Sequence, residues 1–182
     1  TADAFPTADV GFCPDLAFGA TVDAHGEPTV DIVVLARRDA EAVDRPPALR
    51  PGEEQVDWSL GLSSNALWWT SAALEAAVWQ VRGLRLSAYT LARAEMDRRT
   101  ALNLDAACAR LGRGRVVVTD RLHGGVLAAL LGRPVFLVDN VNKKVSAIHR
   151  DYLGSLSDVT LAADFADAMD RARARVASGV RP

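Results

Sequence analysis

Short apolar runs alternate along this chain with longer stretches of helical periodicity. The runs at 29–35, 116–119 and 134–138 are rich in Val, Leu and Ile, and each has the length of a buried strand in a parallel sheet. Residues 124–131, between the second and third runs, have helical spacing and small apolar side chains. Strand, turn, helix and strand in direct succession predict a βαβ unit.

The same alternation predicts the other elements of the chain. Further strands are predicted at 55–60 and 158–161, and helices at 66–81, 91–111, 146–153 and 164–177. Asp164 stands where an N-cap is needed, whereas three prolines and clustered charges make 44–54 a loop. Strands that alternate with helices, without hairpin signals, indicate an α/β protein with a Rossmann-like, doubly wound parallel sheet.

The junction after the strand at 116–119 is the strongest candidate for chemistry. Asp120, Arg121 and His123 lie there, at the carboxyl end of a strand and the start of a helix. Open α/β sheets bind ligands at such ends, and the free N–H groups of a first helical turn attract anions. Arginine matches a carboxylate or phosphate, and imidazole moves protons near neutral pH. The sequence therefore predicts an anion site, in which Gly124 and Gly125 leave room for the ligand.

A purely structural interpretation of the junction has equal support from spacing alone. In that interpretation Asp120 only caps the helix, Arg121 is a solvated surface residue and His123 closes the helix end. The tryptophans of the 66–81 helix pose a similar choice. We expect Trp68, Trp69 and Trp79 to pack in the core or at a domain interface rather than to form a sugar platform.

Composition indicates one well-packed domain and sets few further limits. The 182 residues are 49% apolar and 24% charged, with a net charge of −2 that argues against a general nucleic-acid binder. Residues 1–91 hold 6 Lys/Arg and 13 Asp/Glu, and residues 92–182 hold 15 and 10, so the basic half contains the candidate anion site. We expect most of its arginines, such as Arg171, Arg173 and Arg175, to lie on solvated helix faces.

Cysteine spacing and apolar run lengths suggest a cytosolic setting. Cys13 and Cys108 are far apart, and the sequence has no Cys/His spacing that would hold zinc. No apolar stretch approaches the ~20 residues that a membrane span requires. We therefore expect reduced thiols, no transmembrane segment and no required metal.

Four segments of the chain resemble the polysaccharide pyruvyl transferase family. T-D-R-L-H-G at 119–124 is followed by L-G-x-P, an apolar strand and D-N. P-D-L-A-F at 14–18 and L-A-R-R-D-A-E at 35–41 agree with the family in the same order, and Asp139-Asn140 leads to Lys144 as in the family's D-N-x-x-x-K. The resemblance covers residues 14 to 144.

The resemblance implies a fold and an activity. The family's fold is two Rossmann-like halves similar to GT-B glycosyltransferases, of which this chain is the donor-binding, carboxyl-terminal half. Residues 1–28 would then be the tail of a missing amino-terminal domain and a linker, and 29–182 the donor-binding domain. The activity would transfer pyruvate from phosphoenolpyruvate to two hydroxyls of a sugar as a cyclic ketal, releasing phosphate.

The family also implies the partners and setting of that reaction. Phosphoenolpyruvate is the donor substrate, and no other cofactor is required. The acceptor is a glycan or lipid-linked saccharide of exopolysaccharide or cell-envelope biosynthesis. The protein would therefore work in the cytoplasm or at the inner face of the membrane, and a chain that holds one half alone would have little activity.

The demands of this reaction assign the candidate residues. His123 is assigned as the acid or phosphate ligand, Arg121 and Arg37 as a clamp for carboxylate and phosphate, and Lys144 as the cation beside the leaving phosphate. Further substrate-binding candidates are Asp120, Gly124, Asp139 and Asn140. Asp39 and Glu41 are weaker candidates, with Asp39 able to orient Arg37. The general base for the sugar hydroxyl is assigned to the missing half.

The chain departs from the family pattern at two positions, and two other functions are compatible with the same fold. The family often has H-G-H where this chain has Gly125 as the third residue, and it has glycine where this chain has Lys143. The enzyme rival is a GT-B glycosyltransferase that binds a nucleotide sugar through the same helix. The other rival is a domain of the same fold that binds an anion without turnover.

Overall fold

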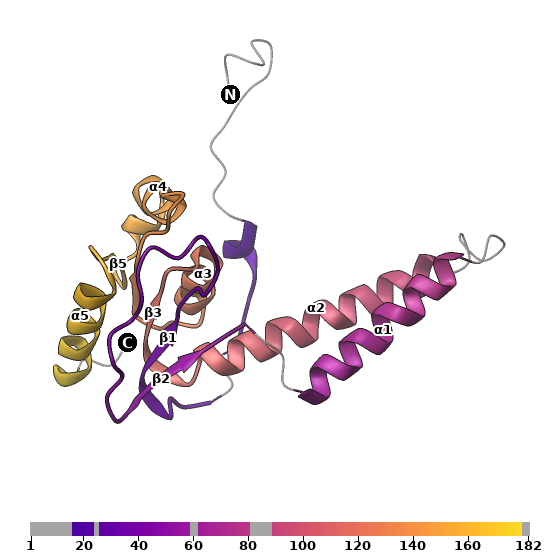
Figure 1. Cartoon of the computed structure of the whole chain (residues 1–182), viewed down its shortest axis with the longest axis horizontal. Coiled ribbons are helices and arrows are strands. Elements are labelled where there is room, and N and C mark those ends of the chain that lie inside the picture. The colour runs from indigo at the N-terminus through magenta and orange to yellow at the C-terminus, as the bar shows by residue number, and fades with distance from the viewer. Residues whose placement is uncertain (1–15, 24–25, 59–61, 81–88, 180–182) are drawn as a thin grey trace, which may run out of the picture.

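The computed structural model describes residues 16–23, 26–58, 62–80 and 89–179, and these form an α/β fold around a parallel sheet (Figure 1). The five strands are β1 (Val30–Leu35), β2 (Glu53–Val56), β3 (Gly114–Thr119), β4 (Val135–Leu137) and β5 (Val159–Leu161). The helices are α1 (Leu62–Gln80), α2 (Tyr89–Leu111), α3 (Leu122–Leu130), α4 (Lys144–Asp151) and α5 (Phe165–Ala177), with short 3-10 turns η2 (Leu16–Gly19) and η3 (Leu153–Ser155).

The central strands are apolar throughout because both faces of the sheet are covered. In β1 and β3, Ile32 pairs with Val116 and Val34 with Val118 in parallel register. These side chains form one core cluster with α5, whereas the alternate residues of the same strands face α2, α3 and α4. The predicted Rossmann-like, doubly wound parallel sheet is therefore confirmed.

Helix α5 covers one face of the sheet, as its sequence predicts. Phe165, Ala168, Met169 and Ala172 follow helical spacing and are buried against β1 and β3. Asp164 caps the helix, because its side chain accepts a hydrogen bond of 2.8 Å from the backbone N–H of Asp167. The N-cap prediction for Asp164 is confirmed.

The edge strand β2 begins earlier than the sequence suggests. The predicted strand was 55–60 and the predicted loop 44–54, but β2 spans Glu53–Val56. Glu53 pairs with Ile32 in the sheet, and its carboxylate accepts from Arg173 at 2.7 Å. This ion pair lowers the pKa of Glu53, chiefly through the Arg173 hydrogen bond. Apolar periodicity misplaced the start of this strand, because the side chain of Glu53 is held by charge. Arg173 was expected on a solvated helix face but pairs with Glu53 instead.

Smaller shifts occur around α4. The predicted helix at 146–153 begins two residues earlier, at Lys144, and ends at Asp151. Leu153 then lies in the separate turn η3 and is fully buried in the core. Leu153 is therefore apolar because it packs in the core, although it lies outside the helix.

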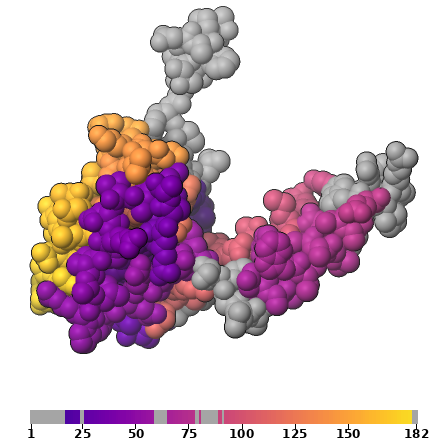
Figure 2. Space-filling model, in the orientation of Figure 1, coloured from indigo at the N-terminus to yellow at the C-terminus, as the bar shows by residue number. Residues whose placement is uncertain are grey.

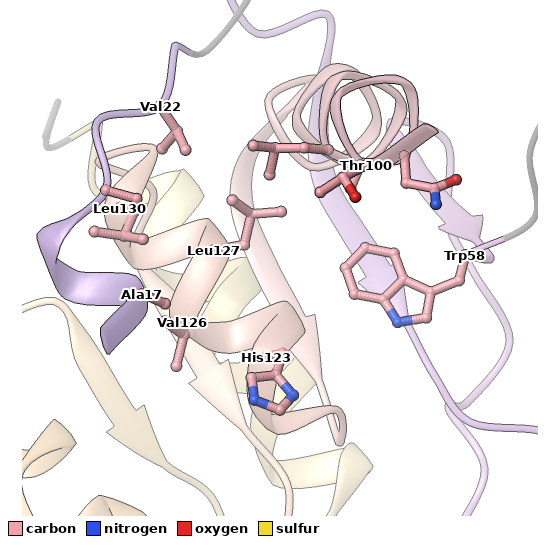
Figure 3. A pocket seen from close by; sticks show the side chains of 12 residues that line it. Ala17, Val22, Trp58, Thr100, His123, Val126, Leu127 and Leu130 are labelled. Carbon is pink, nitrogen blue, oxygen red and sulfur yellow. The ribbon is translucent and has the colours of Figure 1, made fainter. Parts of the chain in front are cut away.

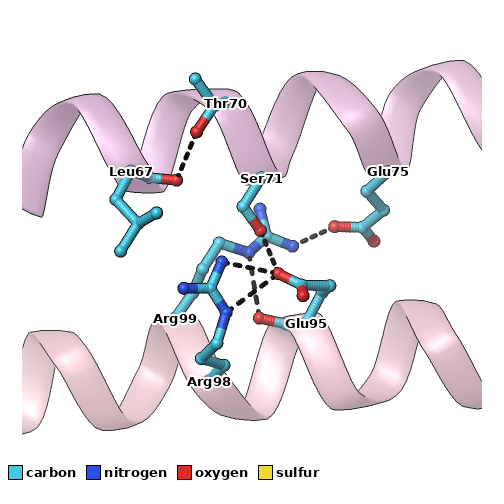
Figure 4. A network of polar contacts seen from close by, with 7 residues as sticks. All are labelled: Leu67, Thr70, Ser71, Glu75, Glu95, Arg98 and Arg99. Carbon is cyan, nitrogen blue, oxygen red and sulfur yellow. Dashed lines mark hydrogen bonds and ion pairs between the residues drawn. The ribbon is translucent and has the colours of Figure 1, made fainter.

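Helices α1 and α2 form a hairpin that projects away from the sheet (Figures 1 and 2). A polar network holds them together: the Ser71 hydroxyl donates to Glu95, Arg98 pairs with Glu95 at 2.8 Å, and Arg99 pairs with Glu75 (Figure 4). Hydrogen bonds from Arg98 and then Ser71 lower the pKa of Glu95. Among the described residues of α2, only the carboxyl-terminal part joins the core, through Ala107, Cys108 and Leu111.

The tryptophans of α1 lie on this hairpin, outside the core of the sheet. Trp68 contacts Trp69 edge to face at 5.1 Å, and the Arg99 guanidinium lies 5.5 Å from its ring centre. Trp69 is 63% exposed, so the expectation that it packs in the core is wrong. The domain-interface alternative stays a prediction, and the Trp79 side chain lies outside the described part of the structure.

The first described residues lie against the same core. Ala17, Phe18 and Val22 pack on the cluster that includes α3, and Phe18 contacts Tyr152 edge to face at 5.7 Å. The division at residue 28 and the GT-B-like partner half stay predictions. No helix in the described ranges is both long and apolar enough to cross a membrane.

Strand order locates the position where this fold binds ligands. The order is β2-β1-β3-β4-β5, so the chain runs from β1 to β2 on one side and then returns to β3 on the other. In open parallel sheets the loops diverge at such a point and leave a crevice at the carboxyl ends of the two strands. In this chain the crevice lies at the ends of β1 and β3.

Candidate active site

Backbone and side-chain hydrogen bonds join the ends of β1 and β3. The backbone N–H of Arg37 donates to Asp120 Oδ1 at 2.9 Å. The Thr119 hydroxyl donates to the carbonyl of Leu35 at 2.7 Å and accepts from the N–H of Arg121 at 3.0 Å. Arg37 is thus brought to one corner with Asp120 and Arg121, although it is distant from them in sequence.

Asp120 connects the two strands at this corner and does not cap α3. It is only 1% exposed, and Arg121 occupies the N-cap position instead. Burial raises the pKa of the Asp120 carboxyl, opposed by hydrogen bonds from backbone N–H groups and by the charges of Arg121 and Arg37. Its second oxygen, Oδ2, has no hydrogen-bond partner among the described residues. A buried acceptor without a partner is unusual enough to suggest that the corner is completed by something else.

The guanidinium of Arg37 is already held by two carboxylates. Its Nε and Nη2 donate to the two oxygens of Asp39 at 2.9 Å each, and Nη2 lies 2.7 Å from Glu41. The Asp39 hydrogen bonds raise the pKa of Arg37, and Arg37 in turn lowers the pKa of Asp39. Asp39 orients Arg37, and an anionic ligand has to compete with it for the guanidinium.

A polar cavity of about 770 Å³ opens beside Arg37. It is formed by the connection between β1 and β2, which contains neither helix nor strand. Arg38 and Arg45 line the cavity with Arg37, and neither has an ion-pair partner among the described residues. The sequence interpretation did not select Arg38 or Arg45, although the dense charges of 37–45 were a signal for them.

Arg121 links this corner to the end of β2. Its Nη2 lies 3.6 Å from Asp57 Oδ1, and its charge contributes to the lowered pKa of Asp39. The side chain is 19% exposed, yet its Nε is buried and has no hydrogen-bond partner among the described residues. Arg121 is therefore not a solvated surface residue, and one of its donors is unused.

The first turn of α3 has no side-chain cap. Helix α3 begins at Leu122, and the side chain of its N-cap residue, Arg121, accepts no hydrogen bond from the first turn. The glycines that follow have a packing role: a Cβ on Gly124 would lie 2.7 Å from Leu35, and one on Gly125 would lie 2.4 Å from Leu137. Their small size lets α3 lie close to the sheet, and the participation of Gly124 in substrate binding stays a prediction.

His123 lies in the first turn of α3 and is exposed, at the edge of a second cavity of about 560 Å³ (Figure 3). This cavity is mostly apolar and is also lined by Trp58, which follows β2 directly after Asp57. The sequence interpretation did not select Trp58, because nothing in its neighbourhood marks it as a site residue. His123 thus shares the α3 N-terminus with Arg121 and also lines this apolar cavity.

The residues after β4 cap α4. Asn140 Oδ1 accepts from the N–H of Lys144 at 3.2 Å, and Asp139 Oδ1 accepts from the N–H groups of Asn140 and Ser146 at 3.0 and 3.2 Å. Their loop contacts the β1 loop through the N–H of Val141, which donates to the carbonyl of Glu41 at 3.3 Å. Asp139 and Asn140 therefore have structural roles, and the Lys144 side chain is exposed nearby.

Lys143 has the left-handed backbone conformation that glycine adopts most readily, with φ of 52°. A Cβ in this conformation costs about 1 kcal/mol. Lys143→Gly is therefore expected to be about 1 kcal/mol more stable than Lys143→Ala, since both variants lose the charge and only alanine retains the Cβ. Urea unfolding of the two variants measures the difference. Equal stability, or a more stable alanine variant, would contradict the backbone strain proposed at position 143.

The comparisons with known proteins agree with this corner. A family model described as polysaccharide pyruvyl transferase matches residues 3–142, which include β1, β3 and the start of α3. The chain belongs to the polysaccharide pyruvyl transferase family. Neither a curated protein nor a solved structure matches it. Membership in the polysaccharide pyruvyl transferases indicates a transferase with a glycan acceptor.

The match includes most of the candidate residues. Arg37, Asp120, Arg121 and His123 all lie within residues 3–142, and Lys144 lies just beyond them. In the described part of this pyruvyl transferase chain, no group of three or more His, Cys, Asp and Glu side chains is placed to hold a metal ion. Cys108 is a buried free thiol whose pKa is raised by burial, away from the corner.

Proposed function

We propose that this protein transfers the pyruvyl group of phosphoenolpyruvate to two hydroxyls of a glycan sugar. The observation that carries the proposal is the corner at the ends of β1 and β3. There Arg121 and the first turn of α3, which has no cap from its N-cap side chain, present positive charge, and the Arg121 Nε donor lacks a partner among the described residues. An anion that bears both carboxylate and phosphate suits such a corner.

The donor would use the polar side of the corner. Arg121 would donate to its carboxylate or phosphate through the guanidinium end that now contacts Asp57 at 3.6 Å. Arg37 would join after exchanging Asp39 and Glu41 for the ligand, and Arg38 and Arg45 would add positive charge in the adjoining cavity. Lys144, exposed at the start of α4, would neutralise the leaving phosphate.

The proposed reaction balances without a further cofactor. The methylene carbon of phosphoenolpyruvate gains a proton, which makes the neighbouring carbon electrophilic. One sugar hydroxyl adds to that carbon, phosphate leaves, and the second hydroxyl closes the cyclic ketal. Of the two hydroxyl protons, one replaces the proton given to the methylene carbon and the other leaves on phosphate. His123, exposed in the first turn of α3, is the proposed proton carrier.

The biological setting follows from the substrates. A glycan or lipid-linked saccharide of exopolysaccharide or cell-envelope biosynthesis is the proposed acceptor. Phosphoenolpyruvate is a cytoplasmic metabolite, so the proposed place of reaction is the cytoplasm or the inner face of the membrane. A second, amino-terminal domain is the proposed source of the general base.

Calorimetric titration tests the donor. Phosphoenolpyruvate is expected to bind more tightly than UDP-glucose or inorganic phosphate, and His123→Ala is expected to weaken it about 10-fold by removing one charge-assisted contact. His149→Ala, the same change on α4, serves as the matched control and should leave binding unchanged. Preference for UDP-glucose would favour a glycosyltransferase, and binding of none of the three compounds would contradict the proposal.

A further inference from the structure

The apolar cavity beside His123 is a groove between matching faces of α2 and α3. Each helix contributes residues at i, i+3, i+4 and i+7, so each presents one face to the groove. They are His123, Val126, Leu127 and Leu130 from α3, and Thr100, Asn103, Leu104 and Ala107 from α2. The walls are apolar, and the polar side chains from these helices are few.

Trp58 stands at one side of this groove and faces α3 (Figure 3). Trp58 is 37% exposed, so packing within the described residues leaves part of its surface uncovered. The backbone N–H of Trp58 donates to Asp57 Oδ1 at 2.7 Å, and the same oxygen lies 3.6 Å from Arg121 Nη2. The backbone of Trp58 is therefore linked, through Asp57, to the residue proposed to bind the donor.

The combination of an indole and a few polar groups matches the surface of a sugar ring. A pyranose has apolar C–H faces and a rim of hydroxyls, and an indole has a broad apolar face. The Asn103 amide has no hydrogen-bond partner among the described residues, and together with His123 it offers donors and acceptors for hydroxyls. The volume of about 560 Å³ lies in the range of small-ligand sites.

We propose that this groove binds the acceptor sugar, with the ring against Trp58 and its hydroxyls toward His123 and Asn103. The proposal rests on the pyruvyl transfer proposed above and adds the acceptor site to it. The donor corner is basic, whereas this groove is apolar and aromatic, so the two substrates have chemically distinct places. His123 belongs to both, since it lies in the first turn of α3 and lines the groove.

Saturation-transfer NMR on the whole chain tests the groove. The probes are the methyl pyranosides of glucose, galactose, mannose and N-acetylmannosamine, measured with and without phosphoenolpyruvate. At least one glycoside is expected to receive saturation on its ring C–H protons. Trp58→Ala should reduce that signal at least fivefold, and Trp58→Phe should retain part of it. Trp69→Ala, which removes an exposed tryptophan from the hairpin, is the matched control and should leave the signal unchanged.

Phosphoenolpyruvate binding by each variant separates this proposal from the proposed function. Two results would overturn the acceptor groove and leave the donor proposal standing. Both have normal phosphoenolpyruvate binding, with either no saturation transfer to any glycoside or equal saturation transfer in Trp58→Ala and wild type. Glycoside binding without phosphoenolpyruvate binding would support the groove and contradict the donor. Saturation transfer to geranyl phosphate but to no glycoside would indicate that the groove binds a lipid chain and would overturn the proposal.

Discussion

Arg121→Gln is expected to weaken phosphoenolpyruvate binding about 10- to 100-fold, the largest effect on function among the corner residues. Among the described residues the charged guanidinium has only one ion pair, of 3.6 Å to Asp57, so its terminal nitrogens can turn to an anion at low cost. Loss of charge-assisted hydrogen bonds costs about 1.5 to 3 kcal/mol, which corresponds to this loss of affinity. Titration calorimetry at constant ionic strength measures it.

The matched control for Arg121→Gln lies on β3, the strand that leads to Arg121. Arg115 pairs with Asp31 at the opposite end of β3, and Arg115→Gln makes the same change of charge. Its phosphoenolpyruvate affinity should remain within about twofold of wild type, because salt screens charges beyond roughly 10 Å. Equal losses of phosphoenolpyruvate affinity in the two variants would mean that net charge, and not a contact made by Arg121, causes the effect.

Phe165→Ala is expected to lower the free energy of unfolding by about 3 to 5 kcal/mol, the largest effect on stability. Phe165 is 0% exposed, and it packs in the cluster between α5 and the β1 and β3 strands. Its removal leaves a cavity in a core that the surrounding residues refill only in part. Urea unfolding followed by circular dichroism measures the change.

Leu156→Ala is the control for that core variant. Leu156 is a large apolar residue near the sheet but is exposed, so its truncation should cost less than about 1 kcal/mol. A loss for Phe165→Ala no larger than that for Leu156→Ala would mean that α5 does not cover the sheet as described. The two variants together therefore test the arrangement of the layer.

Local sequence signals were sufficient for the central βαβ unit. The runs of β1 and β3 are apolar because both faces of the sheet are buried, and this burial makes them recognisable without a structure. Asp164 was likewise identifiable as a cap from its position before an amphipathic helix. Asp120 was weighed as a cap for the same reason, but its carboxylate accepts the distant N–H of Arg37. Sequence position shows where a polar group stands but not which strand it bonds.

Other features depend on contacts that no local pattern contains. Strand β2 is polar, and Arg173, 120 residues away along the chain, holds it. Helix α1 has the apolar character of a buried helix, yet it projects on a hairpin whose packing partner is α2. Arg45 and Trp58 line cavities only because the strand order brings their loops to the ligand-binding edge of the sheet.

The family resemblance supplied what physical patterns could not. Spacing alone left an anion site and a simple helix end equally supported at Asp120, Arg121 and His123. The matched family resolves the class of reaction, and the structure adds that Arg37 and Asp120 meet at this point. The role of each side chain in the reaction stays a prediction until a ligand is bound.

The most direct test of the central claim is an amide NMR titration of the protein with phosphoenolpyruvate. The claim is that the donor binds where β1 and β3 end and α3 begins. It predicts the largest shifts at the amides of 119–125 and at Arg37, smaller shifts at the start of α4 beside Lys144, and little change on the α1–α2 hairpin. Shifts centred on α4 or on the α1–α2 hairpin, or no shifts at saturating phosphoenolpyruvate, would contradict it.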